Sequence, residues 1–167
     1  MDGPAIRAAE DYCHAGYPLD VEALLICELD GPSAEVDHLI EVVGAIARQC
    51  GASTIRVNQD EAERQRFWLG RKAAFPAVGR ISPDYYCMDG TIPRKHLATV
   101  LKRIGELSRE YGLQVANVFH AGDGNLHPLI LYDANKPGEL ERTEELGGKI
   151  LELCVEVGGT ITGEHGV

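Results

Sequence analysis

A tight reversal at residues 120–127 constrains the fold of this chain more than any other local feature. The segment reads HAGDGNLH, and its Asp123 and Gly124 lie between two runs of mainly apolar residues. Two glycines would cost about 2 kcal/mol inside a helix, and Asp and Asn favour turns. An Asp-Gly pair between strand-like runs is a strong signal for a β-hairpin. The sequence therefore predicts two strands, 115–120 and 126–132, joined by this turn.

Helix-like and strand-like segments alternate along the rest of the chain. The apolar spacing predicts five helices. The first covers 5–13, the third covers 60–75 and ends at Pro76, and the fifth runs through 146–157. The second begins at Ser33, its expected cap, and stops at Gly51, and the fourth runs from Pro93 to Gly112. Further strands are expected at 24–29, 54–58 and 85–88. Two strand–helix–strand units follow, from Leu24 to Asn58 and from Tyr85 to His120. This order predicts an α+β domain of the ferredoxin-like kind, with helices packed on one face of a mainly antiparallel sheet.

Composition and charge exclude several classes of function. The chain has 167 residues, enough for one domain with a core, and a net charge of −10. This acidity argues against nucleic-acid binding and against docking on anionic lipid by charge. No apolar run approaches the roughly 20 residues of a membrane helix. The 5 cysteines are widely spread. They fit core positions in a reducing cytosol better than reactive thiols, so we expect a cytoplasmic location.

The two histidines of the hairpin are candidates for a shared site. Residues opposite each other on paired strands have Cβ atoms roughly 5 Å apart, so His120 and His127 should approach closely. The side-chain alternation of a strand gives His120 the face of Val118, and His127 the face of Leu129. Such a pair could bind a metal ion, serve as a structural contact, or act in acid–base chemistry. The spacing alone leaves these three interpretations open.

A second cluster, TGEHG at residues 162–166, adds a carboxylate to this pair. Two histidines and Glu164 would form a three-ligand set that leaves open positions on a metal ion. His165 follows directly in the sequence, so we expect it to point away from the ion and to remain free as a base. The alternative is that both residues belong to a solvated loop.

Arg71 lies on the helical face of large apolar residues. Phe67, Trp68 and Phe75 precede and follow it at helical spacing. A guanidinium there must be paired or must extend to solvent, because burying an unpaired charge is costly. Its partner could be an external carboxylate, which the planar guanidinium binds in a bidentate way, or an internal Asp or Glu.

Four segments together resemble a known family. These are FWLGRKAAFP, YYCMDGTIPR, FHAGDGNLHPLILYD and GGTITGEHGV. They are similar to the C-terminal domain of FAD-linked oxidases of the vanillyl-alcohol oxidase type. The likeness runs over nearly the whole chain. It is strongest to the FAD-containing subunits of the bacterial glycolate oxidase (glycolate dehydrogenase) branch, and D-lactate and D-2-hydroxyglutarate dehydrogenases are similar.

The resemblance implies an FAD-dependent 2-hydroxy-acid dehydrogenase. In such enzymes the α-hydrogen passes as hydride to the flavin, and the hydroxyl proton passes to a base. The substrate is chelated by a divalent metal, zinc or manganese. The matching positions imply metal binding by His120, His127 and Glu164, proton abstraction by His165, binding of the substrate carboxylate by Arg71, and a substrate contact by Asn125.

The likeness also implies a larger assembly. No Gly-rich nucleotide loop occurs in the sequence, so no residue is assigned to FAD binding. We therefore expect residues 1–167 to be a single substrate or cap domain, a fragment without the FAD-binding domain and the extreme C-terminus, and inactive in isolation. The family implies flavin-domain-like and iron–sulfur partner subunits that pass electrons towards the inner membrane, with no direct membrane insertion.

Two other functions fit the same residues. A metal-dependent hydrolase complete in this chain could use the His/His/Glu set to activate water. In a non-catalytic assembly module, the histidines would be structural and the acidic surface would meet a basic partner. Metal analysis of the purified protein separates the module from the other two.

Overall fold

The computed structural model describes residues 1–166, so Val167, the last residue of the second motif, lies outside the described part. The chain divides into two compact units. The first joins residues 1–24 to the segment that starts at Leu69, and the second comprises residues 25–68. All the residues predicted for the site belong to the first unit.

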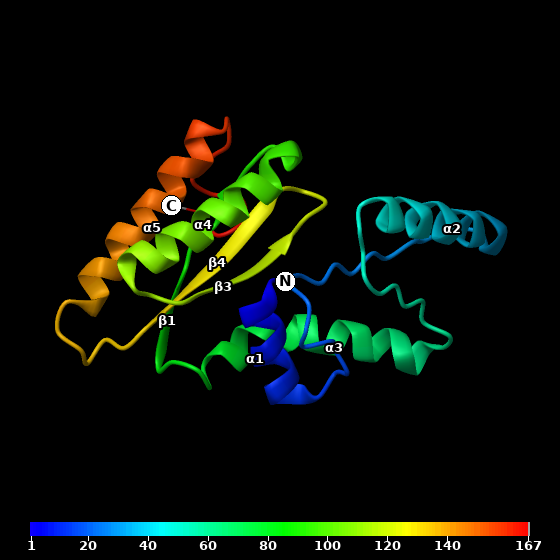
Figure 1. Cartoon of the computed structure of the whole chain (residues 1–167), viewed down its shortest axis with the longest axis horizontal. Helices are drawn as coiled ribbons and strands as arrows, with labels where there is room; N and C mark the ends of the chain where they lie inside the picture. Colours follow the sequence, from blue (N-terminus) through cyan, green and yellow to red (C-terminus); the bar gives the residue numbers. More distant parts are fainter. Residues whose placement is uncertain (167) are drawn as a thin grey trace. The chain divides into compact units, whose positions relative to one another are not determined.

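The first unit contains an open, antiparallel sheet of four strands (Figure 1). Its central strand is β4 (Asn125–Tyr132), and β3 (Val115–His120) pairs along one edge. Along the other edge, β1 (Asp84–Cys87) and β2 (Gly90–Thr91) lie end to end. The predicted hairpin is confirmed, and the sheet leaves a short interruption at residues 88 and 89.

Gly124 makes the reversal between β3 and β4 possible. Its φ of 74° lies in the left-handed region, which glycine adopts without strain. The amides of Asp123 and Gly124 both donate to the carbonyl of His120, at 3.1 and 3.0 Å. A Cβ at Gly124 would also collide with the carbonyl oxygen of Ile92, whose amide donates to the Gly124 carbonyl at 2.9 Å. The turn is therefore held by hydrogen bonds within the hairpin and by the hydrogen bond from Ile92.

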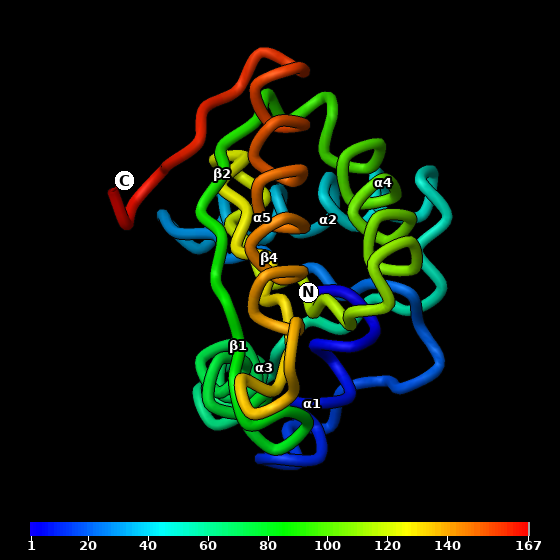
Figure 2. Tube along the Cα trace, turned by 90° about the vertical axis from the view of Figure 1, so that its left-hand side faces the viewer, coloured from blue at the N-terminus to red at the C-terminus, as the bar shows by residue number. Residues whose placement is uncertain are grey.

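One face of the sheet is covered by α4 (Leu97–Tyr111) and α5 (Glu139–Glu156), which lie side by side (Figures 1 and 2). A short 3-10 helix, η1 (Arg94–His96), leads into α4. The helix α4 ends at Gly112, whose φ is 63°. The core on this face includes residues of α4, β4 and α5: Val100, Ile104, Leu126, Ile130, Leu146 and Ile150.

The opposite face is covered by other helices. Residues of α1 (Gly3–Cys13) and the end of α3 (Glu61–Val78) form a second core there, together with Ala116, Val118, Leu129 and Leu131. The expectation of helices on one face is therefore wrong. Both faces of β3 and β4 carry apolar side chains, so both must be removed from water.

The α+β class and the antiparallel character of the sheet are as predicted. The order of elements after α3 is β1, β2, α4, β3, β4, α5. A ferredoxin-like sheet would add a last strand beside β2. Among residues 1–166 that position is represented by one isolated bridge, between Thr160 and Thr91.

The second unit consists of α2 (Ser33–Gln49) and the first turns of α3. The strands predicted at 24–29 and 54–58 are not formed, and Leu25 is 76% exposed. A strand needs a partner for its backbone groups, and residues 25–68 contain no other strand. The first predicted strand–helix–strand unit is therefore wrong.

Two helix boundaries also differ from the prediction. Pro32, rather than Ser33, occupies the N-cap of α2, and it forms no side-chain cap. The helix α3 continues through Pro76 to Val78. No helix within residues 1–166 combines the length and the apolar composition needed to cross a bilayer.

Candidate metal-binding site

His120 and His127 lie close together on one face of the hairpin. His120 pairs with Asn125 and His127 with Val118, so the two histidines are diagonal rather than direct cross-strand neighbours. Their rings are 5.6 Å apart at the centroids and nearly perpendicular, at 89°. The side chain of His127 is 3% exposed and that of His120 is 47% exposed. The pair therefore joins the apolar core to the surface.

Glu164 supplies the third donor. Its carboxylate oxygens lie 3.9 Å from His120 Nε2 and 3.5 Å from His127 Nε2. One donor atom of each residue falls within 4.8 Å of the other two. Ligand atoms placed about 2.1 Å from one tetrahedral ion are about 3.4 Å apart, so the three side chains fit a zinc-sized ion with small adjustments. Two imidazoles and a carboxylate are also a suitable donor set for manganese.

A buried carboxylate, Asp89, holds the segment that carries Glu164. It lies in the interruption between β1 and β2 and is 6% exposed. Its Oδ2 accepts the backbone N–H groups of Gly163, Glu164 and His165 at 2.9, 2.7 and 2.6 Å, and the hydroxyl of Thr162 at 3.0 Å. Burial acts to raise the pKa of Asp89, but these four hydrogen bonds outweigh it and hold the pKa well below its usual range. Asp89 is therefore an anion.

The other oxygen of Asp89 faces His127. Asp89 Oδ1 lies 3.5 Å from His127 Nδ1. Both atoms are buried, and neither has a hydrogen-bond partner within the described residues. Burial lowers the pKa of His127, although the neighbouring charges of Asp89 and Glu164 act in the opposite direction. The imidazole is thus kept neutral, which is the form that binds metal ions.

His165 stacks on His127, with a centroid distance of 5.0 Å and an angle of 6° between the rings. The sequence predicted that His165 would point elsewhere than Glu164, but both side chains lie beside His127. Side chains alternate in an extended strand, but here three successive N–H groups turn towards one oxygen of Asp89. That curled backbone directs Glu164 and His165 to the same side.

Cys87 forms a second possible ligand set with His127 and His165. Burial, followed by the charge of Asp89, raises the pKa of the Cys87 thiol to about 11. A cysteine binds metal as the thiolate. The set of His120, His127 and Glu164 is therefore the better candidate at neutral pH.

Arg71 lies half-buried on α3, near this cluster. Burial lowers the pKa of its guanidinium, whereas electrostatic interactions with Tyr17 and Glu164 raise it. No carboxylate within residues 1–166 forms a salt bridge with Arg71. In this part of the chain, a salt bridge to an internal Asp or Glu, one of the two alternatives left open by the sequence, is therefore not observed.

Asn125 packs behind the ligands. It is 4% exposed, and the hydroxyl of Thr91 donates to its Oδ1 at 3.4 Å. A Cβ added at Gly163 would lie only 2.5 Å from that same oxygen. Asn125 therefore contacts the backbone of the segment that carries Glu164.

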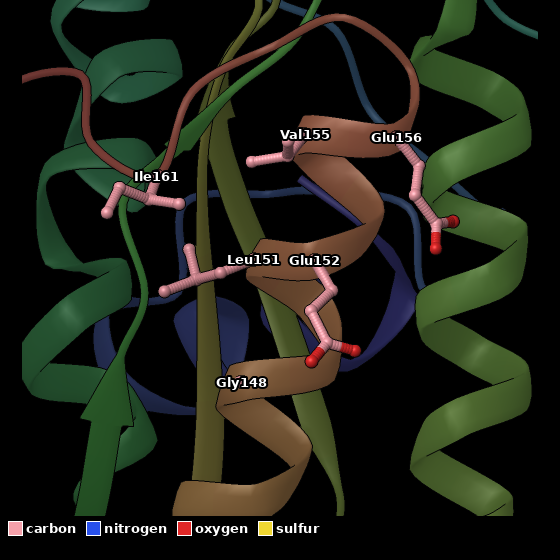
Figure 3. Close-up of a pocket in the computed structure, with 6 residues that line it drawn as sticks. All are labelled: Gly148, Leu151, Glu152, Val155, Glu156 and Ile161. Atoms are coloured by element: carbon pink, nitrogen blue, oxygen red, sulfur yellow. The ribbon is translucent and has the colours of Figure 1, made fainter.

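A hollow of the surface lies away from this cluster. It has a volume of about 370 Å³ and opens along α5. Leu151, Val155 and Ile161 gather on one side of it, while the carboxylates of Glu152 and Glu156 point away from them (Figure 3). None of the predicted site residues lines this hollow, so the hollow is separate from the candidate metal-binding site.

Residues 1–167 match the family described as FAD linked oxidases, C-terminal domain. The chain belongs to this family. As a member of the FAD-linked oxidase C-terminal family, it is 68% identical over 167 residues to the glycolate oxidase subunit GlcD of Escherichia coli K12, and the match covers 100% of the chain. It is 36% identical to the glycolate oxidase subunit GlcD of Bacillus subtilis, and 28% identical to a probable mitochondrial D-lactate dehydrogenase of Danio rerio.

This oxidase domain spans about a third of the length of the relatives it matches. The covered share is 34% of the Escherichia coli protein, 36% of the Bacillus subtilis protein and 34% of the Danio rerio protein.

Asp89 is the residue of this oxidase domain that the sequence interpretation missed. The available signal was an Asp-Gly pair inside YYCMDGTIPR, between two short strand-like runs. Such a pair is also an ordinary turn signal. Its partners are 73 to 76 positions further along the chain, so no local pattern shows that this carboxylate is buried and anchors a site.

Proposed function

We propose that the chain is the substrate-binding domain of an FAD-dependent 2-hydroxy-acid dehydrogenase of the glycolate or D-lactate type. The family and the names of its relatives support the reaction class. The observation that carries the proposal is the convergence of His120, His127 and Glu164 on one point, beside the ring of His165.

The three converging side chains would hold a divalent cation, zinc or manganese. When bound, the cation would supply positive charge that lowers the pKa of a nearby hydroxyl group. Arg71 binds the substrate carboxylate, because its guanidinium forms no salt bridge with a carboxylate within residues 1–166. It also interacts electrostatically with Glu164 of the candidate ligand set. Asn125 helps to position the segment that carries Glu164, because its side chain packs closely against Gly163.

His165 is the base that takes the hydroxyl proton. Its imidazole is exposed and lies beside the candidate ligands, whereas the imidazole of His127 is buried. FAD, held mainly by a part of the protein outside this chain, supplies the hydride acceptor when bound. The substrate thereby loses a hydride and a proton and becomes a 2-oxo acid.

The wider setting is part of the same proposal. Residues 1–167 would act as one substrate domain, with the ferredoxin-like arrangement indicated by the order of β1 to α5. The glycolate oxidase relatives are named as subunits, which supports an enzyme of several subunits. The partners we propose are flavin-domain-like and iron–sulfur subunits at the inner membrane. Its location would be cytoplasmic.

Substitutions in the full-length protein test the proposal. His120→Ala and Glu164→Ala should each abolish 2-hydroxy-acid oxidation and remove stoichiometric metal, while the flavin absorbance stays. His38→Ala, on α2 and outside the cluster, is the matched control and should retain both. Normal turnover in the Glu164 variant would refute the assigned roles.

A further inference from the structure

We propose that Asp89 is a positioning residue that prepares two of the three ligand side chains at once. One of its oxygens anchors the backbone around Glu164, and the other selects the tautomer of His127. The inference rests on the proposed function, because it concerns the same metal-binding side chains.

The anchoring role follows from four hydrogen bonds to a single atom. Asp89 Oδ2 accepts the N–H groups of residues 163, 164 and 165 and the Thr162 hydroxyl, all within 3.0 Å. A concave run of N–H groups around an anion fixes the backbone dihedrals on both sides of each peptide. Glu164 and His165 are both exposed, so we assign the placement of their backbone to this buried carboxylate.

The tautomer role follows from the two unpartnered atoms. Asp89 Oδ1 and His127 Nδ1 are buried, 3.5 Å apart, and have no other hydrogen-bond partner within the described residues. An ionised carboxylate can only accept hydrogen bonds, so the pair is satisfied when Nδ1 carries the proton. Closing the distance by about 0.6 Å gives an ordinary N–H···O hydrogen bond.

The consequence reaches the metal-binding atom of His127. A neutral imidazole carries one N–H, so a proton on Nδ1 leaves the lone pair on Nε2. Nε2 is the atom that faces Glu164, at 3.5 Å. A carboxylate behind a ligating histidine fixes its tautomer and orientation in this way in many metal sites. Asp89 therefore sets both the position of Glu164 and the donor state of His127.

The substitution Asp89→Asn separates these roles from simple packing. The amide oxygen of Asn can still accept the N–H groups of residues 163–165, and its size is unchanged. Its NH₂ group then faces His127 Nδ1, which must accept, so the proton moves to Nε2. We expect the Kd for Zn²⁺, measured on the full-length protein by competition with a chromophoric chelator, to rise about 10- to 100-fold.

Asp84→Asn is the matched control. Asp84 is a partly buried carboxylate at the same edge of the sheet as Asp89, and it accepts the amide of Ala134 at 2.9 Å. It pairs with Tyr132, at the other end of β4 from the site. Its substitution should leave the Kd for Zn²⁺ unchanged. Thr162→Val, which removes one donor to Oδ2 but leaves Oδ1 and His127 intact, should raise that Kd less than Asp89→Asn does.

A second measurement needs neither metal nor turnover. The ¹⁵N chemical shifts of the His127 ring in the metal-free, full-length protein report which nitrogen is protonated. We expect protonated Nδ1 in the wild type and protonated Nε2 in Asp89→Asn. If that variant does not fold, the wild-type spectrum alone decides: protonated Nε2 overturns the inference, and protonated Nδ1 supports it.

The outcomes distinguish this inference from the proposed function. If His120→Ala loses zinc affinity while Asp89→Asn keeps it, the metal centre stands and the positioning role is overturned. If the wild type itself takes up no metal, the proposed function fails. The tautomer measurement then still decides the role of Asp89 towards His127.

Discussion

The imidazole rings of His127 and His165 lie parallel, with centroids 5.0 Å apart and an angle of 6° between them. The first ring is buried in the sheet, and the second is exposed at the surface. This stacking places the candidate base directly beside the candidate metal ligands, although His165 is not itself one of the set of His120, His127 and Glu164. The two roles can therefore be separated by substitution.

His165→Phe should remove turnover and leave the metal in place. A phenyl ring can keep the stacking on His127 but cannot accept a proton. General base catalysis contributes about 10²- to 10⁴-fold, so kcat for 2-hydroxy-acid oxidation should fall by that factor. Metal content by elemental analysis should remain that of the wild type. A variant that loses its metal together with its activity would show that His165 is a ligand.

Gly163→Ala should weaken metal binding through a steric effect. The new Cβ would lie 2.5 Å from Asn125 Oδ1, so the segment around Glu164 must shift. Overpacking of this kind costs about 1–3 kcal/mol of folding stability, which urea denaturation measures. Zinc affinity should fall in parallel.

Gly122→Ala is the control for that substitution. No heavy atom lies within 4 Å of the position its Cβ would take, and it belongs to the hairpin turn between His120 and Asn125 rather than to the segment of Gly163. Its metal affinity and stability should match those of the wild type. Equal effects of the two alanines would contradict the steric explanation.

Local signals account for the parts of the fold that the sequence predicted. The Asp123-Gly124 turn and the apolar runs beside it act over a few residues, and the hairpin formed as expected. Gly112 likewise ended α4 where the sequence placed the end. The three ligand side chains, which the sequence brought into one set, do lie within reach of one another.

Long-range requirements explain the failures. The runs at 24–29 and 54–58 have the composition of strands, but composition does not supply a pairing partner. The helices on the second face of the sheet were not predicted. In a short strand, the sequence pattern does not distinguish apolar side chains on both faces from apolar side chains on one face. Asp89 was missed because its burial depends on a segment more than 70 positions away.

Arg71→Lys should weaken substrate binding without affecting the metal. Lysine keeps the charge but loses the planar, bidentate geometry that matches a carboxylate. We expect KM for the 2-hydroxy acid to rise about 10-fold or more, which corresponds to about 1.4 kcal/mol, with unchanged zinc affinity. Lys72→Met changes the exposed neighbour on the same helix and should leave KM unaffected. An unchanged KM in Arg71→Lys would remove Arg71 from the substrate site.

The buried thiol of Cys154 should make stability depend on alkaline pH. Burial raises its pKa from 9.0 to about 11. Between these values the unfolded chain loses the proton while the folded chain retains it, so the free energy of unfolding falls as pH rises, by up to about 1.4 kcal/mol per pH unit. Cys154→Ala should reduce this slope between pH 9 and 11 in urea denaturation, and the contribution of Cys87, whose pKa burial also raises to about 11, should remain. An identical slope would show that the thiol is not the titrating group.

The close approach of Cys154 to Gly90 predicts a coupling between α5 and the strand edge that carries Asp89. A Cβ added at Gly90 would lie 2.5 Å from Cys154 Sγ, so Gly90→Ala should cost about 1–3 kcal/mol of stability. It should also reduce zinc affinity, because Asp89 precedes it directly in the chain. In the double variant with Cys154→Ala the sulfur is gone, so part of both losses should be recovered, and a double-mutant cycle in urea should give a non-zero interaction energy. Strictly additive losses would mean that the clash is relieved by movement elsewhere, and that α5 does not constrain the position of Asp89.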